Sequence, residues 1–142
     1  LSLKRRLDVL RHEHERVLSR LIAKALEKPR RKRLHALRLM LKTIRYQTEW
    51  LPGQAAIKHD VLKRIKQVQA SLGRYEELAD FRRWGKKLNL TVQVRIERDW
   101  KRARRRARRV PGELAWLPDV LASGRLWMGV DLNETLLSRK DV

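Results

Sequence analysis

The sequence predicts an all-α protein built as a helical bundle. Apolar residues recur at steps of three and four over several long stretches, which is the period of an amphipathic helix. Proline and glycine interrupt these stretches, and no Ser-rich or Gly-rich linker divides the chain. The 142 residues are close to the commonest size of one domain. We therefore expect one bundle over residues 1–125 and an irregular C-terminal tail over residues 126–142.

The first predicted helix begins near Leu3 and ends near Pro29. Its apolar stripe alternates steps of four and three, with His14 filling one gap in the series: Leu3, Leu7, Leu10, Val17 and Leu21. Arg16, Arg20 and Lys24 form a basic ladder at four-residue spacing. This ladder is typical of a solvated helix face.

A second helix is predicted from just after Pro29 to Trp50 and Leu51, because Pro52-Gly53 is a strong stop signal. Its core stripe is Leu34, Leu37, Met40, Leu41, Ile44 and Leu51. A third helix is expected over residues 57–72, where Gly73 breaks it, and a shorter fourth over residues 75–84, before Gly85.

The segment from Leu88 alternates apolar and polar residues over a few positions, as a strand would. A longer helical stripe outweighs this alternation: Val92, Ile96, Trp100, Ala103, Ala107 and Val110. We therefore predict a helix up to Pro111-Gly112 and a final short helix over residues 113–122. From Gly124 onward the chain is expected to be irregular, with Trp116 and Trp127 as packing anchors.

The charge of the chain points to a polyanionic partner. Lys and Arg number 36 against 16 Asp and Glu, which leaves a formal net charge of +20. This charge repels itself in the folded state, so binding of a polyanion is its natural compensation. Nucleic acid, inorganic polyphosphate, an anionic membrane surface and an acidic protein are the classes to consider.

The absence of cysteine excludes disulfides, thiolate nucleophiles and Cys-ligated metal sites. A reducing, cytoplasmic location agrees with this composition. Apolar runs of only a few residues predict neither a transmembrane helix nor a signal-peptide core, and we expect no membrane partner.

The strongest candidate site lies in residues 35–49, which read HALRLMLKTIRYQTE. At about 100° per residue, six polar members of this segment fall within an arc of about 100°, and Arg31 joins the arc one turn earlier. These members are His35, Arg38, Lys42, Arg45, Tyr46 and Glu49. The cationic part of this row is about 15 Å long, which suits an extended string of phosphates better than one small anion.

The residue types in this row suit phosphate chemistry. Guanidinium groups hold phosphate oxygens in bidentate fashion, Lys adds a mobile charge, and His and Tyr can donate hydrogen bonds. Glu49 follows Arg45 by four residues and can orient its guanidinium. We expect the side chains between His35 and Arg45 to project into one wet cavity. The alternative is a solvent-exposed basic face in which His35 is a packing residue.

The pattern H-x-x-R-x-x-x-K-x-x-R-Y resembles the signature helix of the conserved histidine α-helical domain, the CHAD family. Residues 68–73, VQASLG, are similar to the family's L-Q-x-x-L-G segment, and Glu77 matches an acidic residue that follows it. The resemblance covers residues 34 to about 84. It implies a fold of two pseudo-symmetric four-helix halves and the binding of inorganic polyphosphate.

One departure from the family pattern concerns the number of signature helices. The two family halves each contribute a His-and-Arg helix to a shared basic channel, whereas this chain shows that helix once. An upstream half outside this chain, a homodimer, or Arg16 and Arg20 as a reduced second wall could complete the channel. All three remain open at this point.

Catalytic motifs are absent from the sequence. It has no nucleophile motif, Gly-rich phosphate loop or H-E-x-x-H segment, so we expect no enzyme activity, cofactor or metal. His12 and His14 would lie about 200° apart on a helix and cannot share a metal without distortion. Burial or capping is the expected role of both.

The densest charge is a block of Lys and Arg over residues 101–109 with only alanines between them. Such a block could follow RNA or DNA phosphates without reading bases, which makes a nonspecific nucleic-acid-binding module the alternative function. Our main prediction is noncatalytic binding of inorganic polyphosphate in the cytoplasm or at polyphosphate granules. The predicted binding residues are His35, Arg38, Lys42, Arg45, Tyr46, Arg31, Lys66, Arg16 and Arg20.

Overall fold

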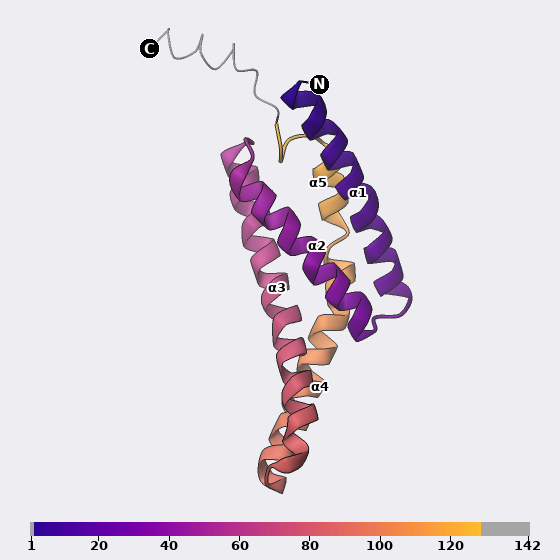
Figure 1. The fold of residues 1–142 in the computed structure, drawn as a ribbon, viewed down its shortest axis with the longest axis vertical. Coiled ribbons are helices and arrows are strands. Elements are labelled where there is room, and N and C mark those ends of the chain that lie inside the picture. The colour runs from indigo at the N-terminus through magenta and orange to yellow at the C-terminus, as the bar shows by residue number, and fades with distance from the viewer. Residues whose placement is uncertain (1, 129–142) are drawn as a thin grey trace.

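The structure is a computed structural model that describes residues 2–128. These residues form an all-α bundle without a strand, which confirms the predicted fold class. Its helices are α1 (Leu3–Glu27), α2 (Arg31–Trp50), α3 (Ala55–Trp84), α4 (Leu90–Glu113) and α5 (Trp116–Ala122), with a 3₁₀ turn over Gly85–Lys87. The long hairpin of α3 and α4 projects beyond the turn that joins α1 to α2 (Figure 1). None of the helices within residues 2–128 is long and apolar enough to cross a bilayer.

Side-chain caps begin two of the helices, and two helices end just before prolines. Ser2 caps α1 by accepting a hydrogen bond of 3.2 Å from the backbone N–H of Arg5. Asn89 caps α4 in the same way, accepting from the N–H of Val92 at 3.0 Å. Helices α1 and α2 end before Pro29 and Pro52 respectively, as predicted.

The predicted break at Gly73 is wrong, because α3 is continuous from Ala55 to Trp84. A glycine inside a helix costs about 1 kcal/mol relative to alanine, which is too little to end a helix that packing holds. Leu72 and Tyr75 are buried on either side of Gly73 and supply that packing. Only the predicted end near Gly85 is confirmed.

The segment after Leu88 is helical, as predicted, and α4 packs along α3. Ala103, Ala107 and Val110 from its predicted stripe are buried, and their small side chains allow close approach of the two helices. Pro111 does not end the helix, which continues to Glu113. The short final helix begins at Trp116, three residues later than predicted.

The core is built from the inner stripes of all the helices. In α2 the predicted positions Leu34, Leu37, Leu41 and Ile44 are buried, and Thr48 joins them. In α1 the buried positions after Leu7 are Leu18, Ile22 and Ala25, whereas the prediction had Val17 and Leu21. A strict alternation of four and three has a period of 3.5 and drifts from a straight helix by about 20° per heptad, whereas Leu18 and Ala25 follow Leu7 by close to whole turns of 3.6 residues. Leu10 and Leu21 of the predicted stripe are partly buried against the same core.

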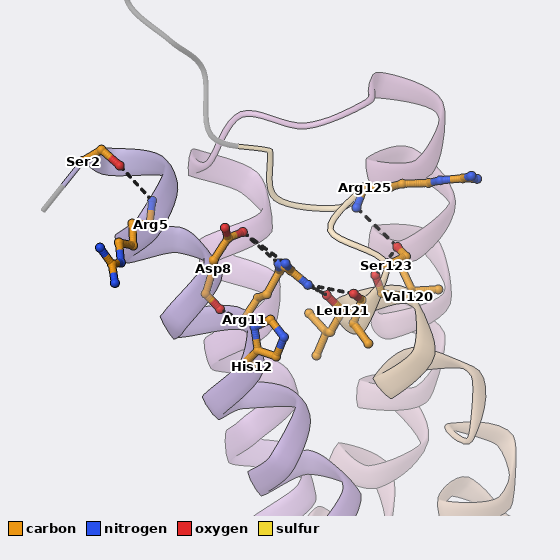
Figure 2. Close-up of polar contacts among 10 residues, drawn as sticks. Ser2, Arg5, Asp8, Arg11, His12, Val120, Leu121, Ser123 and Arg125 are labelled. Atoms are coloured by element: carbon orange, nitrogen blue, oxygen red, sulfur yellow. Dashed lines mark hydrogen bonds and ion pairs between the residues drawn. The ribbon is translucent and has the colours of Figure 1, made fainter.

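The C-terminal part of the described chain docks against α1 and α2. The guanidinium of Arg11 pairs with Asp8 at 3.1 Å and donates hydrogen bonds to the backbone carbonyls of Leu121 at 3.4 Å and Ala122 at 2.7 Å (Figure 2). These carbonyls lie in the last turn of α5, where carbonyls lack the partners of a continuing helix; that of Leu121 also accepts a hydrogen bond of 3.4 Å from the N–H of Gly124. Arg11 therefore fixes the end of α5 on the surface of α1.

Residues 125–128 have no regular helix, yet Leu126 and Trp127 are buried in the core. The packed body therefore extends past the expected boundary at residue 125, and Trp127 is a packing anchor as predicted. Trp116 is partly buried against the same core. The remainder of the predicted tail, residues 129–142, lies outside the described residues.

Candidate functional site

The predicted cationic row lies on the flank of α2 that meets α3. Helices α2 and α3 run antiparallel, as shown by contacts of Arg31 with Asp80 and of Arg45 with Gln69. The row is about 100° around α2 from its buried stripe, so its side chains emerge at the edge of the core. We call this line of contact the α2–α3 seam, defined by Arg31, His35, Arg38, Lys42, Arg45 and Glu49 on α2 and by Lys66, Gln69, Gly73, Glu76 and Asp80 on α3.

Glu76 connects two members of the row. One of its carboxylate oxygens, Oε1, lies 2.5 Å from Nδ1 of His35, and the other accepts a hydrogen bond from Nη1 of Arg38. The Glu76 side chain is 16% exposed, whereas those of His35 and Arg38 are 49% and 41% exposed. One mostly buried carboxylate therefore holds two exposed donor groups side by side.

The two ends of the row also have partners on α3 or α2. Arg31 donates a hydrogen bond of 2.9 Å to Asp80, and Arg45 donates one of 2.8 Å to the side-chain oxygen of Gln69. Nε of Arg45 lies 3.8 Å from Oε1 of Glu49, which is the intrahelical pair expected from their four-residue spacing.

Lys42 and Lys66 supply cations that have no carboxylate partner among residues 2–128. Both are exposed. Nζ of Lys42 lies 5.9 Å from the ring centroid of Tyr46, and Cζ of Arg45 lies 4.9 Å from it. The antiparallel register places Lys66 one turn beyond Gln69, level with Glu49. The seam thus has mobile charges near one end.

Apart from Lys66, sequence reasoning missed the α3 side of the seam. Gln69, Gly73, Glu76 and Asp80 follow one another at steps of four, three and four, which places them on one flank of α3. Gly73 lies opposite Arg38, since a Cβ there would be 3.9 Å from Nη2. The acidic residue matched by resemblance was Glu77, which is exposed and forms no ion pair within the described chain. This spacing becomes informative only when α2 and α3 are known to be adjacent.

The carboxylates of the seam reduce its charge. Its Lys and Arg residues are Arg31, Arg38, Lys42, Arg45 and Lys66, and its carboxylates are Glu49, Glu76 and Asp80. The formal excess is two positive charges with His35 counted as neutral. The exposed pair of Arg31 and Asp80 contributes only about 0–1 kcal/mol, so a phosphate oxygen can replace the Asp80 oxygen at little cost.

The structure does not bring Arg16 and Arg20 to the row. Both are exposed, and they lie about 160–200° around α1 from the buried Leu18. The predicted second wall is therefore not formed by these residues, because the face that carries them points away from the packed side of α1.

Two hollows lie near one end of the seam. The larger, the tip hollow, has a volume of about 950 Å³ and is bounded mainly by the C-terminal half of α3 and the first half of α4. The smaller, the link hollow, has a volume of about 420 Å³ and lies between the α1–α2 link and α4. Arg31 lines both, but none of His35, Arg38, Lys42 and Arg45 lines either. Neither hollow is therefore the cavity expected for these four side chains.

The histidines of α1 have local roles. Nδ1 of His12 lies 2.7 Å from the backbone oxygen of Asp8. His14 is partly buried, with its ring 5.5 Å edge-on from the ring of Trp127, and burial lowers the pKa of its imidazole below the ordinary value. Within residues 2–128 no three His, Asp or Glu side chains gather closely enough to hold a metal ion.

Comparison with protein-family models, curated proteins and solved structures finds no significant match to this chain. The resemblance to the CHAD family therefore stays a prediction based on residues 34 to about 84.

Proposed function

We propose that this chain binds inorganic polyphosphate along the α2–α3 seam and catalyses no reaction. The observation that carries the proposal is the arrangement around Glu76. This carboxylate holds His35 and Arg38 side by side, and both side chains stay exposed. The guanidinium N–H groups of Arg38 that do not face Glu76 are available to phosphate oxygens without a conformational search, which lowers the entropic cost of binding.

The length of the seam suits a polymer. From Arg31 to Arg45 the row extends roughly 20 Å at 1.5 Å per residue. Lys42 and Lys66 add charges that no described carboxylate neutralises. A compact anion would contact only part of this line, whereas a linear polyanion contacts cations along all of it.

The overall charge supports the same ligand class. A net charge of +20 attracts a polyanion over a distance of about 10 Å at moderate ionic strength. Resemblance of the row to the CHAD signature helix adds inorganic polyphosphate as the ligand that the family binds. On this proposal the protein acts in the cytoplasm, where it associates with polyphosphate granules.

The alternative function is nonspecific binding of RNA or DNA through the basic block on α4. The exposed arginines of this block are Arg102, Arg104, Arg105, Arg106, Arg108 and Arg109. Such contacts give affinity without base readout, and they weaken steeply with salt. This surface lies on a different helix from the seam, so mutations separate the two functions.

A titration with long-chain polyphosphate, single-stranded RNA and orthophosphate tests the proposal. The two polymers are compared at equal phosphate concentration over a series of salt concentrations. We expect polyphosphate to be preferred over RNA at every salt concentration, and orthophosphate to bind far more weakly than either. A preference for RNA at equal charge would contradict the proposal and support the alternative.

A further inference from the structure

The link hollow gathers positive charge from two distant parts of the chain. Its cations are Lys28, Arg30 and Arg31 around the turn between α1 and α2, and Arg104 and Arg108 on α4. Glu27 is the one carboxylate among the residues that line it. Four of these cations have no carboxylate partner in the described chain, and the fifth, Arg31, pairs with Asp80 outside the hollow. This concentration of charge is costly unless an anion occupies the hollow.

The backbone at the start of α2 adds to the positive potential. The N-cap residue Arg30 and the first helical residue Arg31 both line the hollow. No side chain caps this helix, and its first turn contains no acidic residue. The first N–H groups of a helix have no intrahelical partners and carry the positive end of its dipole, which favours a negatively charged ligand.

Tyr75 supplies a hydrogen-bond donor at a wall that the link hollow shares with the tip hollow. Its side chain is buried, with 7% of the residue exposed, and it lines the hollow from α3. No hydrogen bond joins its hydroxyl to any other residue in the part of the chain that the structure describes. Its hydroxyl oxygen is not among the fully buried polar atoms without a partner, and an anionic oxygen in the hollow would be a suitable acceptor for it.

We propose that the link hollow binds the terminal phosphoryl group of a phosphate chain. A terminal group carries about 1.5 to 2 negative charges near neutral pH, because its second pKa is about 6. An internal unit, bridged on both sides like a backbone phosphate of nucleic acid, carries about one. The excess of cations in the hollow therefore selects the end of a chain over its interior.

The link hollow adjoins the α2–α3 seam at Arg31, so one phosphate chain can occupy both sites. Arg31 lines the hollow and is also the first member of the α2 row. A chain whose end enters the hollow can leave past Arg31 and continue along His35 and Arg38. The inference rests on the proposed function for the identity of this longer ligand, whereas the hollow itself requires only a terminal phosphoryl group.

Calorimetry with pyrophosphate, in which both phosphates are terminal, tests the hollow directly. We expect one bound pyrophosphate per chain and at least a tenfold loss of affinity in Arg104→Gln/Arg108→Gln. The matched control is Arg105→Gln/Arg109→Gln, which removes the same charge from exposed positions of α4 that do not line the hollow. We expect less than a twofold loss in the control. Equal losses in the two variants, or binding that survives the first, would overturn the inference.

Two further measurements separate this inference from the proposed function. Tyr75→Phe keeps the buried ring and removes the hydroxyl, so pyrophosphate should bind about fivefold more weakly, and an unchanged affinity would contradict the role of Tyr75. Long-chain polyphosphate with both ends capped should bind more weakly than the uncapped polymer. If pyrophosphate binds in the hollow but long-chain polyphosphate does not bind along the seam, the proposed function is contradicted and the inference about the hollow is supported. If the polymer binds along the seam and pyrophosphate does not bind, the inference about the hollow is contradicted and the proposed function is supported.

Discussion

The indole Nε1 of Trp127 donates a hydrogen bond of 2.9 Å to the hydroxyl of Thr48, which lies 79 residues earlier in the chain. Both side chains are almost completely buried. The Thr48 hydroxyl in turn donates to the backbone oxygen of Ile44 at 2.7 Å, so it is used as donor and acceptor at once. This contact joins the C-terminal segment to the helix that carries the cationic row.

Thr48→Val should destabilise the fold. Valine has nearly the same shape but accepts no hydrogen bond, so the buried N–H of Trp127 would lose its partner. We expect a loss of about 1–3 kcal/mol in the free energy of unfolding, measured by urea denaturation. Thr43→Val is the control, because Thr43 is exposed on the same helix and bonds only to the backbone oxygen of Leu39. Equal changes in the two variants would mean that the contact with Trp127 contributes nothing.

Gly53→Ala should also destabilise the fold. A Cβ at this position would lie 2.1 Å from the backbone oxygen of Leu126, and neither backbone can move without disturbing the packing of Trp127. We expect about 1–3 kcal/mol of destabilisation. Gly73→Ala provides the contrast, because a Cβ there meets its nearest atom at 3.9 Å within a continuous helix. That change should stabilise by up to about 1 kcal/mol, and a loss of stability would show that Gly73 is needed for the fold.

His14 should make the stability depend on pH. Burial lowers the pKa of its imidazole below the ordinary value of 6.5, and Nε2 is buried without a hydrogen-bond partner. Below about pH 6.5 the unfolded chain binds this proton more readily than the folded chain, so stability falls as the pH falls through this range. Above it, neutral His14 contributes its full packing against Trp127.

Urea denaturation across the pH range measures this effect. In His14→Gln the fall in stability below pH 6.5 should become smaller. His12→Gln serves as the control, since His12 is exposed, and it should keep the fall seen in the wild type. A wild-type stability that does not change between neutral and mildly acidic pH would contradict the prediction.

Two substitutions of Glu76 separate its charge from its positioning role. Glu76→Gln keeps an acceptor near Arg38 and removes the charge that competes with phosphate, so affinity for long-chain polyphosphate should rise by up to about fivefold. Glu76→Ala removes the acceptor as well, and its affinity should be lower than that of Glu76→Gln. Asp60→Asn is the charge-matched control, because Asp60 pairs with Arg64 away from the seam. The same gain in this control would indicate that only net charge matters.

Removal of two cations from the row should weaken polyphosphate binding and its dependence on salt. In Arg38→Gln/Arg45→Gln we expect at least a tenfold loss of affinity, and the slope of log K against log salt should become smaller by roughly two. Arg105→Gln/Arg109→Gln loses the same charge elsewhere and should change the slope little. Equal slopes in the two double variants would show diffuse attraction instead of binding at the seam.

Local sequence signals predicted most of the secondary structure. Pro29 and Pro52 marked helix ends because proline restricts the residue before it and cannot donate a backbone hydrogen bond. Gly73 gave a false end, because the cost of one glycine is smaller than the burial of Leu72 and Tyr75 beside it. The apolar stripe predicted from the helical period matches the buried residues of α2. In α1 the buried residues lie one position after the predicted ones from Leu18 onward.

The sequence by itself determined that the chain is helical, strongly basic and carries a cationic row on one side of α2, because periodicity and composition are local properties. Only the tertiary structure decided which residues face that row. It placed Glu76 and Asp80 against the cations, directed Arg16 and Arg20 away, and brought Arg104 and Arg108 to the start of α2. The physical reason is that helix periodicity fixes a residue's direction on its own helix, whereas its neighbours across a bundle depend on how buried surfaces pack.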